Sequence, residues 1–145
     1  MSKLTTEAVA KALAGALDQD NTNIFSSINV VDTAAGSVIA AKQEEDGITV
    51  FITVDEQQIR TVSYLFKMDD IQEDQRLTIA KQLLIESLSL PLVSFGIETD
   101  GQEENVVIFG SMSASSGIDE LIEEVETVFA TSELVANDIE SIVKV

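Results

Sequence analysis

The chain has 145 residues, a formal net charge of −18, and neither Cys nor His. The lack of both residue types excludes disulfides, thiolate nucleophiles, zinc–thiolate centres and any catalytic triad with a histidine base. Hydrophobic residues make up 45% of the sequence and Trp is absent. We therefore expect one domain, residues 1–145, with a core built mainly from Val, Ile, Leu and Ala.

The charge is unevenly distributed. No Lys or Arg occurs between Lys81 and Lys144, whereas Asp and Glu recur throughout that stretch. A surface of this sign repels phosphate backbones and anionic lipids, which disfavours direct nucleic-acid binding and electrostatic membrane docking. Two interpretations remain: the acidic surface binds a basic protein partner, or it only keeps the protein soluble. The N-terminal stretch is too polar for a signal peptide, and no apolar run reaches membrane-spanning length, so a cytoplasmic location is expected.

The first half of the chain predicts one helix and four strands. Thr5 or Thr6 is a suitable N-cap for a helix that runs to about Leu17. The polar segment 18–23 has carboxylates and amides at alternate positions, as a calcium loop does, but it lacks the required Gly and the closing Glu, and we interpret it as an ordinary loop. Strands are expected over 24–31, 37–42, 48–54 and 59–67. In the last of these, alternation places Arg60, Val62, Tyr64 and Phe66 on one face.

The second half predicts helix, two strands and helix. A helix starts within 68–75 and must end before Pro91, with a buried stripe at Leu77, Ala80, Leu83, Leu84 and Leu88. Two strands, 92–99 and 105–111, flank an Asp-Gly turn. Ser116 is the expected N-cap of the last helix. Its apolar face comprises Ile118, Leu121, Ile122, Val125, Val128 and Phe129. Residues 131–133 could kink or split this helix, so its continuity past Thr131 is left open; the stripe resumes beyond them.

This order of elements, α-β-β-β-β-α-β-β-α, indicates an α+β domain. Its strands come in hairpins and not in βαβ units, so an antiparallel sheet of about six strands with helices on one face is expected. The layout is similar to that of type III secretion chaperones, an analogy of fold alone.

Three segments resemble a known family. They are Pro91–Gly96 (PLVSFG), Val107–Ser113 (VIFGSMS), and Ser115-Ser116 followed by Asp119–Val125 (DELIEEV). They are similar to the C-terminal half of the YjfI-like proteins, a bacterial cytosolic family of unknown function. Members are often encoded beside relatives of phage-shock protein A, a coiled-coil protein of the inner membrane. The resemblance thus implies a partner role near such a protein, and it supplies no catalytic residues.

Candidate interaction residues lie in this same half. Pro91, Phe95 and Phe109 could form a binding groove, or the two Phe side chains could be cross-strand neighbours in the core. The Gly/Ser segment 110–117 could hold an anion at a helix N-terminus, although the acidic residues that follow disfavour phosphate. Tight turns and capping explain its composition better.

The last helix adds an acidic face. Its carboxylates are Asp119, Glu120, Glu123, Glu124 and Glu126. They could bind Mg²⁺ or Ca²⁺, but carboxylates at this spacing usually form a solvated helix surface that can meet a partner. We predict no catalytic residue, metal site or cofactor.

Two classes of function follow. The first is a small acidic adaptor or chaperone-like protein that binds its partner through the sheet or the last helix. Such a protein could act as a homodimer. The second is an enzyme that works with carboxylates, with or without a divalent metal. A weaker hypothesis is an acidic mimic of nucleic acid. An exposed apolar patch would support the first, and inward-facing carboxylates in a deep pocket the second.

Overall fold

The computed structural model describes residues 5–18, 27–33, 36–42, 47–90 and 92–143, without the side chains of 16–18 and 137–143. In chain order the elements are α1 (Thr6–Asp18), β1 (Ser27–Thr33), β2 (Gly36–Lys42), β3 (Thr49–Val54), β4 (Gln58–Lys67), the 3₁₀ turns η1 (Met68–Asp70) and η2 (Glu73–Gln75), α2 (Arg76–Ser87), β5 (Ser94–Asp100), β6 (Glu103–Ser113) and α3 (Ile118–Val143). The predicted order of helices and strands is confirmed.

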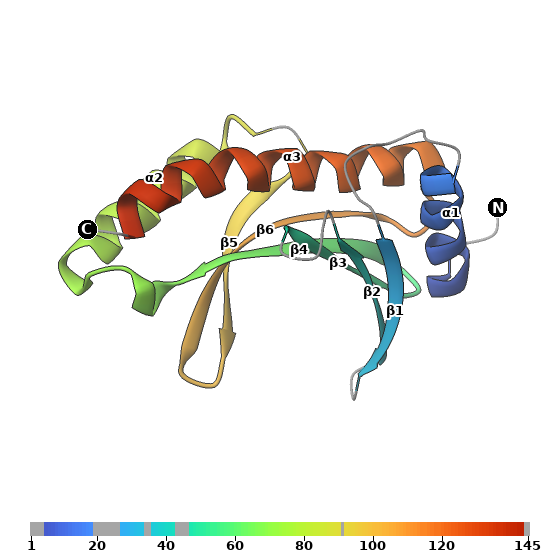
Figure 1. Cartoon of the computed structure of the whole chain (residues 1–145), viewed down its shortest axis with the longest axis horizontal. Coiled ribbons are helices and arrows are strands. Elements are labelled where there is room, and N and C mark those ends of the chain that lie inside the picture. The colour runs from blue at the N-terminus through green and yellow to red at the C-terminus, as the bar shows by residue number, and fades with distance from the viewer. Residues whose placement is uncertain (1–4, 19–26, 34–35, 43–46, 91, 144–145) are drawn as a thin grey trace.

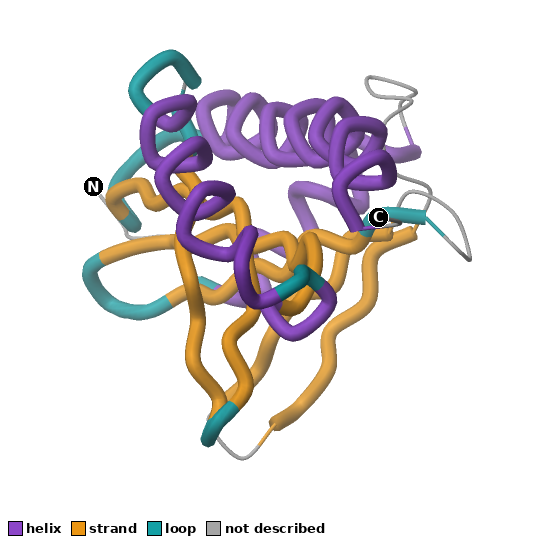
Figure 2. Tube along the Cα trace, turned by 90° about the vertical axis from the view of Figure 1, so that its left-hand side faces the viewer, coloured by secondary structure: helices purple, strands orange, loops and turns teal. Residues whose placement is uncertain are grey.

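The six strands form one antiparallel sheet in the order β1-β2-β3-β4-β6-β5. The helices lie on one side of it (Figures 1 and 2), which confirms the α+β prediction. The chain crosses over through α2, so that β6 pairs with both β4 and β5 and leaves β5 at the edge. The sheet is strongly bent, and its β1–β2 and β5–β6 hairpins both project away from α3 (Figure 1).

Local chemistry closes the turns. At the β3–β4 turn, the Asp55 carboxylate accepts hydrogen bonds from the backbone N–H groups of Gln57 and Gln58, each 2.7 Å long. These bonds favour the ionised form and hold the pKa of Asp55 below its ordinary value. At the predicted Asp-Gly turn between β5 and β6, Gly101 has φ +64°, a conformation that glycine adopts without steric cost.

The core lies between the sheet and α3, with α1 closing one end. From α3, Leu121, Val125, Val128 and Phe129 are fully buried. The helix-side faces of the strands and the α1 residues Val9 and Leu13 complete the cluster. As predicted, Thr5 caps α1, because its Oγ1 accepts a hydrogen bond of 3.1 Å from the N–H of Ala8.

One open question about the elements is answered and two predictions are wrong. The last helix is continuous from Ile118 to Val143, and Thr131 and Ser132 are buried within it. It is not capped by Ser116; instead the Glu120 carboxylate accepts a hydrogen bond from the N–H of Gly117. In β4, the pairing register shifts between Tyr64 and Phe66, so Phe66 does not share the face of Tyr64.

Candidate functional site: an open sheet face, the outer side of α2 and a buried carboxyl

In the part of the chain that the structure describes, no helix covers the second face of the sheet (Figure 1). The pairing register aligns side chains across three strands there: Phe51 of β3 is opposite Val62 of β4, and Val62 is opposite Phe109 of β6. Tyr64 lies two residues beyond Val62 on the same face. We call this surface, with Phe51, Val62, Tyr64 and Phe109 at its centre, the open face.

Tyr64 is the most accessible aromatic residue of the open face, at 47% exposure. Its ring packs edge-on against Phe51, with ring centroids 5.8 Å apart and an interplanar angle of 72°. Its hydroxyl donates a hydrogen bond of 2.7 Å to Glu98 Oε1 on β5. Partial burial and then this carboxylate raise the pKa of Tyr64 to about 12, so the phenol remains a neutral donor at physiological pH.

Carboxylates border the open face along the β5–β6 hairpin. The register places Glu98, Asp100 and Glu103 on the same side as Phe109. Lys67 forms a salt bridge of 3.2 Å with Glu103, but both side chains are about half exposed, so the pair contributes little to stability. The open face therefore combines accessible aromatic rings with an acidic margin.

The proposed groove of Phe95 and Phe109 does not form, because the two rings lie on opposite faces of the sheet. Phe95 is paired with Ile108 and faces the core, whereas Phe109 is paired with Ser94 on the open face. The alternative, in which they were cross-strand neighbours in the core, is wrong for the same reason. Gly96 gives the Phe109 ring its space, since a Cβ at this position would lie 2.9 Å from the ring. Pro91, the third residue of that prediction, lies outside the described residues.

The acidic helix face is smaller than predicted. Asp119, Glu120 and Glu123 are exposed, as expected for a solvated surface. Glu124 instead points into the protein and is only 5% exposed. Its position could have been read from the spacing, because it lies three residues after Leu121 and four before Val128, on the buried stripe of α3.

Glu124 occupies a space above β6 that glycine leaves vacant. A Cβ on Gly110 would lie 2.7 Å from Glu124 Oε1 and 3.2 Å from the carbonyl oxygen of Leu92. Leu92 has φ +65°, an uncommon conformation for leucine. Glu124 Oε2 is buried and has no hydrogen-bond partner among the described residues. Loss of hydration raises the pKa of Glu124 from its ordinary value of 4.5 to about 7.

The outer side of α2 differs most from the prediction. No residue of α2, all of which is described, is buried. The expected stripe is largely in solvent: Leu77 is 68% exposed, Leu84 65% and Leu88 91%, and the neighbouring Ile85 is 69% exposed. We call Leu77, Leu84, Ile85 and Leu88 the α2 stripe. Contiguous exposed apolar side chains of this size mark an interaction surface more often than isolated ones do.

A hydroxyl group attaches the inner side of α2 to the sheet. Ser87 Oγ donates a hydrogen bond of 3.0 Å to the carbonyl oxygen of Leu83 and accepts one of 2.9 Å from the N–H of Phe95. At the other end of the helix, Arg76 Nε donates to the carbonyl oxygen of Ile71 at 3.0 Å. Polar contacts therefore fix both ends of α2, and few side chains pack between them.

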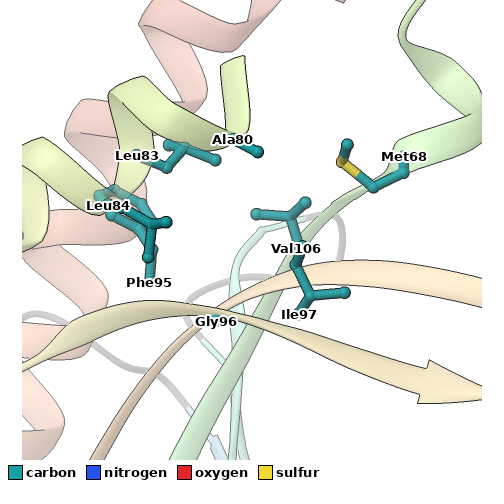
Figure 3. A pocket seen from close by; sticks show the side chains of 8 residues that line it. All are labelled: Met68, Ala80, Leu83, Leu84, Phe95, Gly96, Ile97 and Val106. Carbon is teal, nitrogen blue, oxygen red and sulfur yellow. The ribbon is translucent and has the colours of Figure 1, made fainter. Parts of the chain in front are cut away.

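An apolar pocket of about 190 Å³ lies between α2 and the edge of the sheet (Figure 3). It is lined by Met68, Ala80, Leu83, Leu84, Phe95, Gly96, Ile97 and Val106. Leu84 belongs both to this lining and to the α2 stripe, so the pocket and the stripe form one continuous apolar surface. Ile97, which is 49% exposed, extends this surface onto β5.

Two further observations concern ions and membranes. Among the described residues, no three Asp or Glu side chains come together in a way that could hold a metal ion. Within the same residues, no helix is both long enough and apolar enough to cross a bilayer.

A family model described as an uncharacterized protein conserved in bacteria, DUF2170, matches residues 4–143. The chain belongs to the DUF2170 family. No curated protein matches this DUF2170 chain in sequence. Among solved structures, it is similar to YbjN from E. coli, described as a candidate transcription regulator, with a TM-score of 0.54 and 13% identity over 92% of this chain and 96% of that one. At this identity the likeness extends to the fold alone.

Proposed function

We propose that this DUF2170 protein is an adaptor or chaperone-like protein that holds a basic segment of another protein on its open face. The observation that carries the proposal is Tyr64, an accessible ring that lies beside Phe51 and bonds to Glu98 within an acidic margin. Aromatic faces attract Lys and Arg side chains, and nearby carboxylates strengthen that attraction.

The overall charge supports a basic partner. At −18, the protein attracts cationic segments over long range and accelerates their association at low ionic strength. The sheet also ends in an edge strand, β5, beside this margin, and an edge strand can pair with an extended segment. The sites for cationic side chains and for backbone pairing are thus adjacent.

The proposal also concerns the kind of protein that supplies the basic segment. The resemblance to YjfI-like proteins favours a coiled-coil protein similar to phage-shock protein A. A role in regulation, as named for YbjN, would be exerted through a protein and not through DNA, because the charge of this chain repels phosphate. A tagged pull-down eluted in salt steps tests this. Recovery of a coiled-coil protein of that type at moderate salt is expected, and its absence would contradict the choice of partner.

The binding surface can be tested without knowing the partner. The chain has one Tyr and no Trp, so its tyrosine fluorescence reports Tyr64 alone. Titration with an arginine-rich peptide that contains no aromatic residues should change this emission, with an affinity that falls as salt is added. The same titration, followed by NMR, should shift the amide signals of β4, β5 and β6.

Matched charge variants provide the control. The pair Glu98→Gln and Asp100→Asn removes two carboxylates from the margin of the open face. The pair Asp74→Asn and Glu86→Gln removes two exposed carboxylates near α2 and leaves the same net charge. We expect only the first pair to weaken peptide binding several-fold. Equal weakening by both pairs would show that binding follows overall charge and would contradict a site at Tyr64.

No reaction is proposed for this protein. Carboxylates are abundant, but none of the described observations favours the enzymatic hypothesis or the nucleic-acid mimic over binding of a basic segment.

A further inference from the structure

We infer that the α2 stripe is the contact through which two copies of this chain form an antiparallel, two-fold symmetric dimer. Leu77 and Leu84 of α2, and Leu88 directly after its last residue, are separated by seven and four residues, and Leu88 keeps a helical backbone conformation, so the three fall on one line. Each has most of its surface in solvent. A helix with an apolar line on its outer side, already attached to the sheet by its inner side, can bury that line against an identical helix.

The local charge favours a second copy over another occupant. Within α2 the charged residues are Arg76, Lys81 and Glu86. Arg76 forms a salt bridge of 3.8 Å with Asp69, and Lys81 and Glu86 carry opposite charges. The helix is therefore close to neutral in a protein whose net charge is −18. Two such helices can approach with little local repulsion, and a strongly basic partner of the kind proposed for the open face gains nothing here. The acidic surfaces of the two copies remain in solvent.

Two-fold symmetry sets the register. When the stripes are centred on each other, Leu77 of one copy meets Leu88 of the second copy, and Lys81 lies beside Leu84 of the second copy. The lysine stem then covers the leucine while its ammonium group reaches the rim. The pocket beside Leu84 is open to the same surface and can accept an apolar side chain of the second copy.

The available area is sufficient for a modest dimer. If the four stripe residues lose their exposed surface, each copy buries roughly 500 Å², and Ile97, the pocket and the Lys81 stem bring this toward the roughly 800 Å² per partner of a standard interface. We therefore expect a dimer that dissociates in the micromolar range and tightens as salt screens the repulsion between the two acidic bodies.

Sedimentation equilibrium on the pure full chain tests this without any other ligand, so it does not depend on the proposed function. We expect dimer mass for the wild type and at least a tenfold weaker dimer for Leu84→Glu, with an unchanged far-UV circular dichroism spectrum. A wild type that is monomeric up to several hundred micromolar would overturn the inference and would leave the binding of basic peptides untouched.

The natural absence of Cys makes the interface itself testable. A single Leu84→Cys substitution introduces the only thiol of the chain. Mixed with Lys81→Cys protein, it should form a disulfide-linked dimer on mild oxidation. Gln82→Cys, an exposed position on another side of the same helix, is the matched control and should remain monomeric. Equal crosslinking through position 82, or none through 81 and 84, would exclude this contact.

Discussion

Glu124 makes the stability of this protein depend on pH near neutrality. Burial raises its pKa from 4.5 to about 7, so between these values the folded state binds more protons than the unfolded state. The free energy of unfolding therefore falls as pH rises from about 5 to about 8, by about 3 kcal/mol at most. Urea unfolding of the wild type at both pH values should show this loss.

Glu124→Gln is the control for that prediction, because an amide of the same shape does not ionise. Its unfolding free energy should lack the fall between pH 5 and pH 8, and the variant should be the more stable protein at pH 8. A fall of the same size in wild type and variant would assign the effect to other carboxyl groups.

Gly110 should not tolerate a side chain. A methyl group at this position would lie 2.7 Å from Glu124 Oε1 and 3.2 Å from a backbone carbonyl oxygen. We expect Gly110→Ala to lower the free energy of unfolding by about 1–3 kcal/mol. Gly15→Ala is the matched control, since it lies in α1 with open space around it, and it should raise stability by about 0.5–1 kcal/mol. Destabilisation by both substitutions would contradict a specific clash at Gly110.

Glu124 also shows a limit of prediction from the sequence. The stripe of Leu121, Val125 and Val128 was evident, and its spacing included Glu124. We assigned Glu124 to the solvated face because it stands among other acidic residues. The space above Gly110 that admits a carboxyl group depends on how β6 lies under α3. This is a tertiary relation that no local pattern contains.

At the scale of the element, the Ser87 hydroxyl group is a polar contact between α2 and the sheet. It donates to the carbonyl oxygen of Leu83 and accepts from the N–H of Phe95, at the start of β5. Ser87→Ala should lower stability by about 1 kcal/mol. More specifically, it should accelerate hydrogen exchange in α2 while exchange in α3 stays slow, because the loss is local. Uniform acceleration in both helices would show that α2 unfolds only with the whole domain.

The same helix shows the limit of periodicity. Apolar residues on two sides of α2 satisfy a helical repeat, and the pattern predicts a helix correctly. It does not say which side meets the sheet. Ala80 and Leu83 do, whereas Leu77 and Leu88 face outward and Leu84, at the rim of the pocket, is also mostly exposed. Where a helix is apolar on two sides, one side belongs to the core and the other becomes a candidate contact.

At the scale of the whole molecule, charge opposes compactness. Like charges repel one another in a chain of 145 residues with a net charge of −18. The two described salt bridges, whose carboxylates are both more than half exposed, offset little of this repulsion. We expect the melting temperature to rise as sodium chloride increases from low to physiological concentration. A variant with four exposed carboxylates changed to amides should show a smaller rise. If the melting temperature of that variant rose as much as that of the wild type, the rise would be a general salt effect and would not reflect charge repulsion.

The order of elements, the antiparallel sheet and the one-sided helices were predictable from hydrophobic alternation, turn residues and the single proline. The order of strands in space was not. Pairing of β6 with β4 follows from the crossover through α2, and it brings Phe109 beside Val62 on the open face. The register of the β5–β6 hairpin places Phe95 and Phe109 on opposite faces. The candidate site was therefore the least predictable part, because its residues come together only through long-range pairing.

The pairing between β4 and β6 is a seam between two parts of the chain. Residues before η1 form α1 and a meander of four strands, and residues after η2 supply α2, β5, β6 and α3. A cut between η1 and η2 would therefore give one fragment with the meander and α1 and a second with the β5–β6 hairpin, α2 and α3. Because β4 and β6 pair over most of their length, the separate fragments should recognise each other through that seam and rebuild the domain when they are co-expressed.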